Sequence, residues 1–275
     1  MGNRLQAKRC LIVGGTAGLG RAAAVRFLEE GAKLVIAGRS AEKGAEALTA
    51  LRELGSVAFF PCDAAVSEQV DRLFTDAVAF LGGLNVLYHV AGISGRRFGD
   101  GPLHECTDEG WDATLTANLT STFLTNRAAV RCFRQQNSPG VILNMASVLG
   151  FSPAPHHFDT YAYTATKGGI VSMSRLAAAR YAADGIRVNV LAPGLIDTPM
   201  ASRAVNDPAI RHYLRTKQPL TAGPGQPEDC SDAAVFLCSD AARFITGVVL
   251  PIDGGWSVSE GQYQTNAEVR MQNAE

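Results

Sequence analysis

A tyrosine and a lysine four residues apart stand out in this 275-residue sequence as a pair whose types and spacing suggest chemistry. They are Tyr163 and Lys167 in the segment YTATK. On a helix, residues i and i+4 share a face and lie about 5–6 Å apart, so these side chains face one another, whereas Tyr161 lies off that face. A nearby cation lowers the pKa of a phenol, whose ordinary value of about 10 is too high for a base at neutral pH. The pair therefore suggests a general acid and base, although a tyrosine and a lysine packed on a helix surface would have the same spacing.

A glycine-rich turn near the N-terminus suggests a dinucleotide site. The apolar run RCLIV is followed by Gly14, Thr16, Gly18, Leu19 and Gly20, which open into an amphipathic segment of helical period. Glycines allow a tight turn and a close approach of a pyrophosphate to the main-chain N–H groups at the start of a helix. The order strand, turn, helix is the context that such a site requires.

The end of the second apolar run bears on which dinucleotide binds. An acidic residue there would hydrogen-bond the ribose 2′-hydroxyl of NAD, but the segment AGRS contains none. Arg39 can hold a 2′-phosphate through two hydrogen bonds, and Ser40 can donate another. We therefore predict NADP(H) as the cofactor; NAD(H) is the alternative if Arg39 is only a solvated loop residue.

A repeating pattern of strands and helices must position these residues. Short apolar runs alternate with Ala-rich segments of helical period, and continuous apolar runs are typical of parallel strands covered on both faces. We predict an α/β fold over residues 1–259, a single doubly wound parallel sheet of about seven strands with helices on both faces (a Rossmann fold). The predicted strands are RCLIV, KLVIA, VAFFP, NVLYHV, GVILNM, RVNVL and GVVLPI. The predicted helices cover 18–30, 41–54, 67–81, a long stretch after residue 107, the segment that carries Tyr163, and 227–238.

Two segments fall outside this pattern. Residues 197–225 contain four prolines and are predicted to form a small insertion of short helices and loops on the substrate side. Residues 260–275 form a polar tail. The sequence is compatible with two states of this tail, one closed over a neighbouring subunit's site and one disordered.

Composition and charge exclude several functional classes. The net charge is −1 and no basic run is long enough to follow a nucleic acid. The apolar runs are shorter than the roughly 18 residues that span a bilayer, and the N-terminus has no secretion signal, so we expect a cytoplasmic protein without membrane contact. The six cysteines contain no C-x-x-C and the five histidines show no ligand spacing, so no metal is predicted.

With these motifs in one chain, the sequence resembles the short-chain dehydrogenase/reductase family. The family's Thr-Gly-x-x-x-Gly-x-Gly motif is matched at Gly14, Gly18 and Gly20, with Val13 in place of the threonine. The resemblance implies the catalytic residues Asn118, Ser147, Tyr163 and Lys167. It also implies cofactor contacts from Asp63, Ala91, Gly92, Tyr163, Lys167, Pro193, Gly194, Ile196 and Thr198.

The resemblance further implies a reaction and an assembly. A hydride would pass between a nicotinamide and the carbon of a secondary alcohol, a ketone or a sugar-type hydroxyl, with Tyr163 as acid and base. Ser147 would orient the substrate oxygen, and Asn118 would hold a water that links Lys167 to solvent. Family members are commonly homotetramers, here through the helices over 107–137, 161–183 and 227–238.

Two departures from the family pattern stand out. The family's Asn-Asn-Ala-Gly is replaced by HVAG, in which we interpret His89 as a structural residue. Ser147 and Tyr163 are 16 positions apart, a few more than the family pattern. The extra residues lie in FSPAPHHFD, where family members line the substrate pocket.

The substrate is predicted only in outline. Arg96, Arg97, His156 and His157 would make the mouth of the site basic, which suggests an anionic or polyhydroxylated substrate unless they are solvated loop residues or subunit contacts. The apolar candidates for the pocket are Leu149, Phe151, Leu195 and Met200.

Two other functions remain open at this point. One is an epimerase or dehydratase of the related sugar-nucleotide branch, which carries a larger C-terminal substrate domain than this chain has room for. The other is a cofactor-sensing protein without turnover, which would be expected to lack one of the four catalytic residues.

Overall fold

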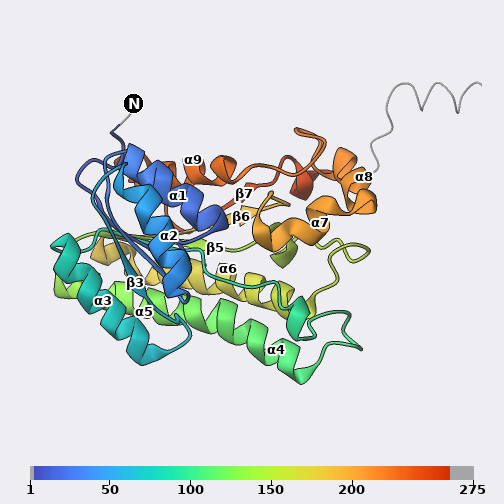
Figure 1. Ribbon diagram of the computed structural model, residues 1–275, viewed down its shortest axis with the longest axis horizontal. Coiled ribbons are helices and arrows are strands. Elements are labelled where there is room, and N and C mark those ends of the chain that lie inside the picture. The colour runs from blue at the N-terminus through green and yellow to red at the C-terminus, as the bar shows by residue number, and fades with distance from the viewer. Residues whose placement is uncertain (1–2, 261–275) are drawn as a thin grey trace, which may run out of the picture.

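A parallel sheet of seven strands forms the centre of the molecule in the computed structural model, which describes residues 3–260 (Figure 1). The strand order is β3-β2-β1-β4-β5-β6-β7. The strands are β1 (Arg9–Val13), β2 (Lys33–Gly38), β3 (Val57–Pro61), β4 (Val86–His89), β5 (Gly140–Met145), β6 (Ile186–Pro193) and β7 (Val249–Ile252). The predicted fold class is confirmed.

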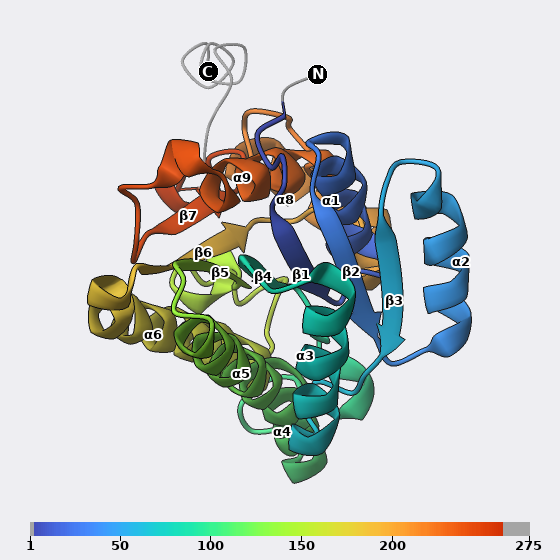
Figure 2. The same cartoon turned by 90° about the vertical axis from the view of Figure 1, so that its left-hand side faces the viewer.

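Helices cover both faces of this sheet (Figure 2). They are α1 (Gly18–Glu29), α2 (Ala41–Arg52), α3 (Ser67–Leu81), α4 (Asp108–Leu115), α5 (Ser121–Gln135), α6 (Tyr161–Tyr181), α7 (Ser202–Asn206), α8 (Pro208–Lys217) and α9 (Pro227–Cys238). Helices α1, α2 and α9 contribute to the core on one face, whereas α3, α5 and α6 contribute to the core on the other.

Strand β1 shows why its sequence is apolar throughout. Cys10 and Ile12 belong to one core, and Leu11 and Val13 belong to the other, because successive side chains of a strand point to opposite faces of the sheet. All four side chains are buried, as a strand covered on both faces requires.

The direction in which the chain crosses the sheet reverses between β1 and β4. The first crossovers build β2 and β3 on one side of β1, and the later strands begin with β4 on its other side, where Val13 pairs with His89. Ligands of open α/β sheets bind beyond the carboxyl ends of the strands at such a reversal.

The structure differs from the sequence prediction in the segment after residue 107. The predicted long helix consists of α4 and α5 joined by a π-helical turn, Thr116–Thr120, which contains Asn118. A π-helical turn inserts an extra residue into the helical repeat and often occurs at functional sites.

The segment over 197–225 forms α7, α8 and a short 3-10 turn at Pro199–Ala201. It packs around a third, small core that includes Val148, Leu195, Leu214 and Trp256. We call α7, α8 and this core the cap. Of the polar tail, only Glu260 belongs to the described residues, so the prediction for 261–275 lies outside them.

Candidate active site

Two adjoining hollows lie beyond the carboxyl ends of β1, β4, β5 and β6. The larger one has a volume of about 730 Å³ and follows the glycine-rich turn. The smaller one has a volume of about 370 Å³ and lies against the cap. Seven residues line both: Leu19, Val90, Gly92, Ile93, Arg97, Thr198 and Met200. A ligand that fills the larger hollow therefore forms part of the wall of the smaller one.

The glycine-rich turn brings backbone close to backbone at the floor of the larger hollow. Gly14 has a φ of 93°, and a Cβ on it would lie 2.6 Å from the Ala91 nitrogen. A Cβ on Gly20 would collide with the Gly14 carbonyl group. The N-cap residue of α1, Ala17, makes no side-chain hydrogen bond. The first N–H groups of this helix are thus left for an anion, as a pyrophosphate site requires.

Three polar side chains border the far end of this hollow. Arg39 is exposed and follows directly after β2. Ser40 is the N-cap of α2, and its hydroxyl accepts a hydrogen bond from the Lys43 nitrogen at 3.2 Å. Lys43 lines the hollow beside them and is not among the predicted site residues. Lys43 lies in the first turn of the predicted helix over 41–54, just after the predicted cofactor residue Ser40. This position would have made it a candidate.

Asp63 and its neighbours form another wall of the larger hollow. The Asp63 carboxylate accepts a hydrogen bond from the Ala65 nitrogen at 3.0 Å, and the Asp63 nitrogen donates one to Gln69 at 2.8 Å. These contacts hold the loop after β3 against the hollow. The glycine turn, the uncapped helix and these walls together fit a dinucleotide.

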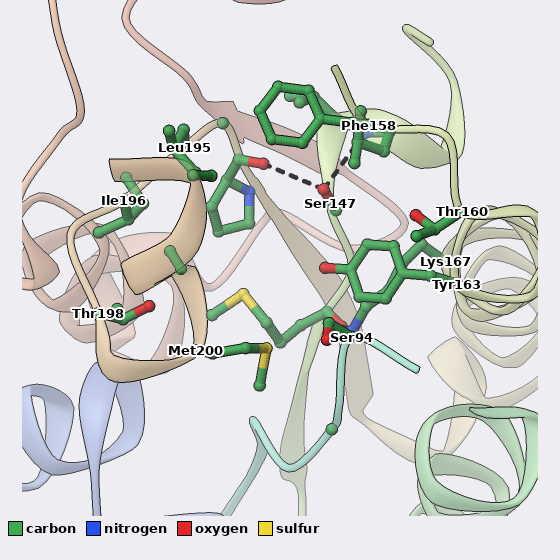
Figure 3. Close-up of a pocket in the computed structure, with 18 of the residues that line it drawn as sticks. Ser94, Ser147, Phe158, Thr160, Tyr163, Lys167, Leu195, Ile196, Thr198 and Met200 are labelled. Atoms are coloured by element: carbon green, nitrogen blue, oxygen red, sulfur yellow. Dashed lines mark hydrogen bonds between the residues drawn. The ribbon is translucent and has the colours of Figure 1, made fainter. Parts of the chain in front are cut away.

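Tyr163 and Ser147 meet in the smaller hollow (Figure 3). The phenol of Tyr163 points into the cavity, on the side that faces Ser147. The Ser147 hydroxyl accepts a hydrogen bond from the Leu149 nitrogen at 3.2 Å and donates one to the Pro193 carbonyl at 3.4 Å. Burial raises the pKa of Tyr163, and the nearby Ser147 hydroxyl lowers it in part.

Lys167 lies beneath the ring of Tyr163, as the helical spacing predicts. Its side chain is buried, with Nζ 5.4 Å from the centre of the Tyr163 ring, and Nζ donates a hydrogen bond to the Met145 carbonyl at 3.0 Å. Burial lowers the pKa of Lys167 to about 8. The ammonium was expected to lower the pKa of Tyr163, but this pKa is raised, because burial of the phenol outweighs the effect of the Ser147 hydroxyl.

Asn118 joins three segments around the two hollows. Its side chain is fully buried; the amide oxygen accepts from the Ile93 nitrogen at 2.7 Å, and the amide nitrogen donates to the Ile93 carbonyl at 3.1 Å and to the Thr166 hydroxyl at 3.2 Å. Asn118 therefore ties the loop after β4 to the helix of Tyr163. That Asn118 also holds a water linking Lys167 to solvent stays a prediction.

A residue that the sequence analysis missed fixes the start of α6. Asp100 is buried, and its two carboxylate oxygens accept hydrogen bonds from the Ala162 nitrogen at 3.0 Å and the Tyr163 nitrogen at 2.9 Å. The N-cap residue Thr160 makes no side-chain hydrogen bond, so Asp100 caps the helix from a distant loop. Its position 60 residues earlier gave no local signal in the sequence.

His89 is held between two hydroxyl groups behind the site. Its Nδ1 lies 2.9 Å from the Thr125 hydroxyl and its Nε2 lies 3.3 Å from the Ser121 hydroxyl. Burial, together with the charge of Lys167, lowers the pKa of His89 to about 3. The imidazole is therefore neutral at physiological pH and links β4 to α5, in keeping with its interpretation as structural.

The structure brings some of the predicted substrate residues together and leaves others apart. Arg96, Arg97, Leu149, Leu195 and Met200 line the smaller hollow, which also includes Pro193, Gly194 and Ile196 from the predicted cofactor segment. Three predicted residues line neither hollow: His156, His157 and Phe151. His157 packs onto the cap, where its ring lies 4.7 Å from that of Tyr213, whereas His156 and Phe151 are exposed to solvent.

The lining residues outside the predicted set include Ser94, Phe158, Thr160, Arg203 and Trp256. Phe158 and Trp256 pack with ring centres 5.5 Å apart and form an apolar wall. Both could have been named as candidates for the substrate pocket from the sequence, because Phe158 lies in the longer loop before Tyr163 and Trp256 follows DGG.

Further features of residues 3–260 bear on function. No helix in this range is long and apolar enough to cross a bilayer. Nor does any group of three or more His, Cys, Asp or Glu side chains in the range have an arrangement that suits a metal ion. The six cysteines carry free thiols.

Comparison with known proteins gives the family. The family model described as enoyl-(acyl carrier protein) reductase matches residues 14–257. The chain is 38% identical to 2,5-dichloro-2,5-cyclohexadiene-1,4-diol dehydrogenase of Sphingobium indicum, with 94% of this chain and 99% of the relative covered. It is 36% identical to 3beta-hydroxysteroid dehydrogenase 1 of Eggerthella lenta, covering 94% and 96%. It is 35% identical to cis-4-hydroxycyclohexanecarboxylate dehydrogenase of Sinomonas cyclohexanicum, covering 94% and 99%.

A solved structure shares the fold over nearly the whole chain. It is a short-chain type dehydrogenase/reductase from Mycobacterium ulcerans, 28% identical, with a TM-score of 0.86 and coverage of 92% of this chain and 91% of the other. The relatives are dehydrogenases of secondary alcohols, and the match to them extends over nearly the whole of each. The chain is thus an NAD(P)-dependent oxidoreductase and belongs to the short-chain dehydrogenase/reductase family.

Proposed function

We propose that this enzyme interconverts a ring-bearing secondary alcohol and its ketone, with Tyr163 as the general acid and base. The observation that carries the proposal is the phenol of Tyr163, which points into the smaller hollow beside Ser147, where that hollow adjoins the larger one. The names of three relatives support a ring alcohol, since each denotes a hydroxyl group on a ring.

Each side chain has a defined task in this proposal. In the direction of oxidation, Tyr163 takes the proton of the substrate hydroxyl, and Ser147 donates a hydrogen bond to the same oxygen and orients it. Lys167 places a positive charge beneath the phenol, which favours the phenolate that accepts this proton. Asn118 positions Ile93 and the helix of Tyr163 through its amide hydrogen bonds.

The larger hollow would hold the cofactor, which when bound accepts or donates the hydride. Gly14, Gly18 and Gly20 leave room for the pyrophosphate, and Asp63 borders the adenine end. Gly92, Pro193, Ile196 and Thr198 line the smaller hollow, where the nicotinamide would lie.

The test removes only the phenolic oxygen. Tyr163→Phe is expected to abolish turnover in a panel of cyclic alcohols and ketones while the affinity for the cofactor stays within about twofold, since the phenyl ring keeps its packing. Tyr161→Phe is the matched control, because Tyr161 is exposed and lines neither hollow. Full activity of Tyr163→Phe would refute the assignment, and no turnover of any alcohol or ketone by the wild type would favour a cofactor-sensing protein.

We further propose that NADP(H) is preferred over NAD(H). The support is the cluster of Arg39, Ser40 and Lys43 at the end of the larger hollow, with no acidic residue at the tip of β2. Guanidinium and ammonium groups would hold the 2′-phosphate through charge-assisted hydrogen bonds. Arg39→Ala is expected to weaken NADPH binding by about tenfold or more and to leave NADH binding unchanged.

Two observations in fluorescence titrations would decide the cofactor question. Arg52→Ala, at the exposed end of α2, is the matched control and should bind both cofactors as the wild type does. Tighter binding of NADH than of NADPH by the wild type, unchanged in Arg39→Ala, would reject the preference.

A homotetramer is also proposed. Large apolar side chains are exposed on the helices that the family uses for assembly, among them Trp111 on α4, Phe123 on α5 and Leu176 on α6. Burial of such side chains between subunits would remove them from water. Light scattering that reports a monomer at micromolar concentration would exclude this assembly.

A further inference from the structure

Polar, apolar and cationic side chains line the smaller hollow. Tyr163 and Ser147 occupy the reacting end (Figure 3). Phe158, Leu195 and Trp256 contribute to an apolar wall, and the last of these is almost completely buried. The cationic mouth is defined here as Arg96, Arg97 and Arg203, all of which line the hollow.

The arginines of the mouth stand on packed backbone segments, and Arg96 and Arg203 are themselves exposed. Arg96 lies in a short 3-10 turn between Gly95 and Gly99, and the turn is fixed by the Thr107 hydroxyl, which donates to the Phe98 carbonyl at 3.0 Å. Arg203 lies on α7 next to Ala204, which is buried in the core of the cap. Both guanidinium groups are therefore carried on packed segments.

Neither Arg96 nor Arg203 has a carboxylate partner at ion-pair distance within residues 3–260. Partial burial lowers the pKa of Arg96, and the charge of Arg203 lowers it further, whereas Asp100 and Asp159 oppose this effect. Asp100 already accepts two backbone hydrogen bonds at the start of α6. The mouth thus holds like charges close together, and an anion bound between them would relieve their repulsion.

The guanidinium groups of the mouth indicate which kind of ligand fits. The three arginines line the hollow, whereas neither Asp100 nor Asp159 lines it. A carboxylate carries one negative charge and presents two oxygens in the plane that guanidinium groups match.

We propose that the substrate is a hydroxy acid with a ring-sized apolar body, whose carboxylate is bound by Arg96 and Arg203 while its hydroxyl lies at Tyr163 and Ser147. The inference rests on the proposed function, because it uses Tyr163 to define the reacting end. The carboxylate is unchanged by the reaction: the carbinol carbon loses a hydride to the oxidised cofactor, its hydroxyl loses a proton to Tyr163, and the product is the keto acid.

The experiment compares matched charged and neutral ligands. We would measure kcat/KM for 4-hydroxycyclohexanecarboxylate and for its carboxamide, and titrate cyclohexanecarboxylate and cyclohexanecarboxamide calorimetrically into the cofactor-loaded enzyme. The wild type is expected to favour the carboxylate over the amide by about tenfold or more in both measurements. Arg96→Gln and Arg203→Gln are each expected to lower the values for the carboxylate by about tenfold and to leave those for the amide within about twofold.

Arg211→Gln is the control variant, because Arg211 is exposed on α8 and lines neither hollow. It should retain the wild-type preference. The proposal would be overturned if the wild type bound the carboxylate and the amide equally, or bound neither. It would also be overturned if the preference for the carboxylate persisted in both Arg96→Gln and Arg203→Gln. The calorimetric titration measures binding without reaction, so it separates the two proposals. A carboxylate preference without turnover would support the anion site and reject the proposed function. Turnover of neutral alcohols without a carboxylate preference would support the proposed function and reject the anion site.

Discussion

Tyr163 shows how opposing effects on one residue set its chemistry. Burial disfavours the phenolate and raises its pKa, whereas the Ser147 hydroxyl favours the phenolate. Lys167 is itself buried with a pKa lowered to about 8, and its ammonium donates to the Met145 carbonyl. Because the pKa of Tyr163 is raised, the phenol is neutral at neutral pH. A neutral phenol can donate the proton that ketone reduction requires.

A first prediction concerns the pH dependence of alcohol oxidation. Oxidation requires the deprotonated tyrosine, so kcat/KM rises as the pH approaches the pKa of Tyr163 from below. Ser147→Ala removes a group that lowers this pKa, so the rising limb should move to higher pH and the maximal rate should fall. The measurement is a pH profile of kcat/KM for both proteins.

Ser56→Ala is the control for this profile, since Ser56 is exposed in the turn before β3 and lines neither hollow. Its rising limb should coincide with that of the wild type. A limb for Ser147→Ala that stays in place or moves to lower pH would contradict the role given to Ser147.

At the scale of elements, the start of α6 depends on a loop distant in sequence. The sequence predicts the helix from its period and the lysine beneath the tyrosine from its spacing. It does not predict Asp100 as the cap or the π-helical turn around Asn118, because both depend on contacts through space between segments far apart in the chain. Local patterns thus locate the helices, and tertiary contacts orient their ends.

The second prediction tests this cap. Asp100→Ala leaves the Ala162 and Tyr163 N–H groups without their acceptors, and should lower the free energy of unfolding by about 1–3 kcal/mol. Because the start of the helix also positions the phenol, kcat should fall more than KM changes. Urea denaturation and steady-state kinetics provide the two readouts.

Asp100→Asn should partly restore both properties, because one acceptor oxygen remains. Asp71→Ala, an exposed substitution on α3, is the control and should change stability by no more than about 0.5 kcal/mol. If Asp100→Ala kept both the stability and the kcat of the wild type, Asp100 would have no positioning role.

At the scale of the whole molecule, a cluster of ion pairs around a buried carboxylate joins the N-terminal segment to α9. The Glu30 side chain is only 2% exposed and contacts Arg4 at 2.7 Å and Arg26 at 3.3 Å. Arg26 in turn contacts Asp232 on α9 at 2.8 Å. The hydrogen bond from Arg4 is the main cause that lowers the pKa of Glu30.

The third prediction follows from that lowered pKa. The stabilising contribution of Glu30 is present above its unfolded pKa of about 4.5 and is lost as the pH falls through the lower folded value. Glu30→Gln should therefore lower the free energy of unfolding by about 1–3 kcal/mol at pH 7, and the difference from the wild type should shrink below pH 4.5. Urea titrations at pH 7, 5 and 3.5 measure it.

Glu29→Gln is the control, because Glu29 forms a partly exposed pair with Arg26 at 3.2 Å and should change stability by less than about 1 kcal/mol. A difference between Glu30→Gln and the wild type that grows at acid pH would contradict this account.

The fold and the cofactor side of the site were more predictable than the substrate side. Apolar periodicity and a glycine turn are local features, so the strands of the sheet and the glycine turn of the larger hollow follow from them and from the resemblance. The mouth of the smaller hollow brings Arg96 together with Arg203, more than 100 residues later, and the loop with His157 turns toward Tyr213 instead. No spacing rule relates such segments, since their contacts depend on the packing of the cap.

The separate core of the cap has a consequence for how this enzyme can change. Leu195, Ile210, Leu214 and Trp256 pack with one another in a cluster distinct from the two cores that hold the sheet. Substitutions there would alter the shape of the substrate wall without disturbing the packing beneath the glycine turn. Laboratory evolution toward new substrates is therefore best directed at the cap, where many amino-acid exchanges can be sampled while the cofactor-binding half of the protein stays intact.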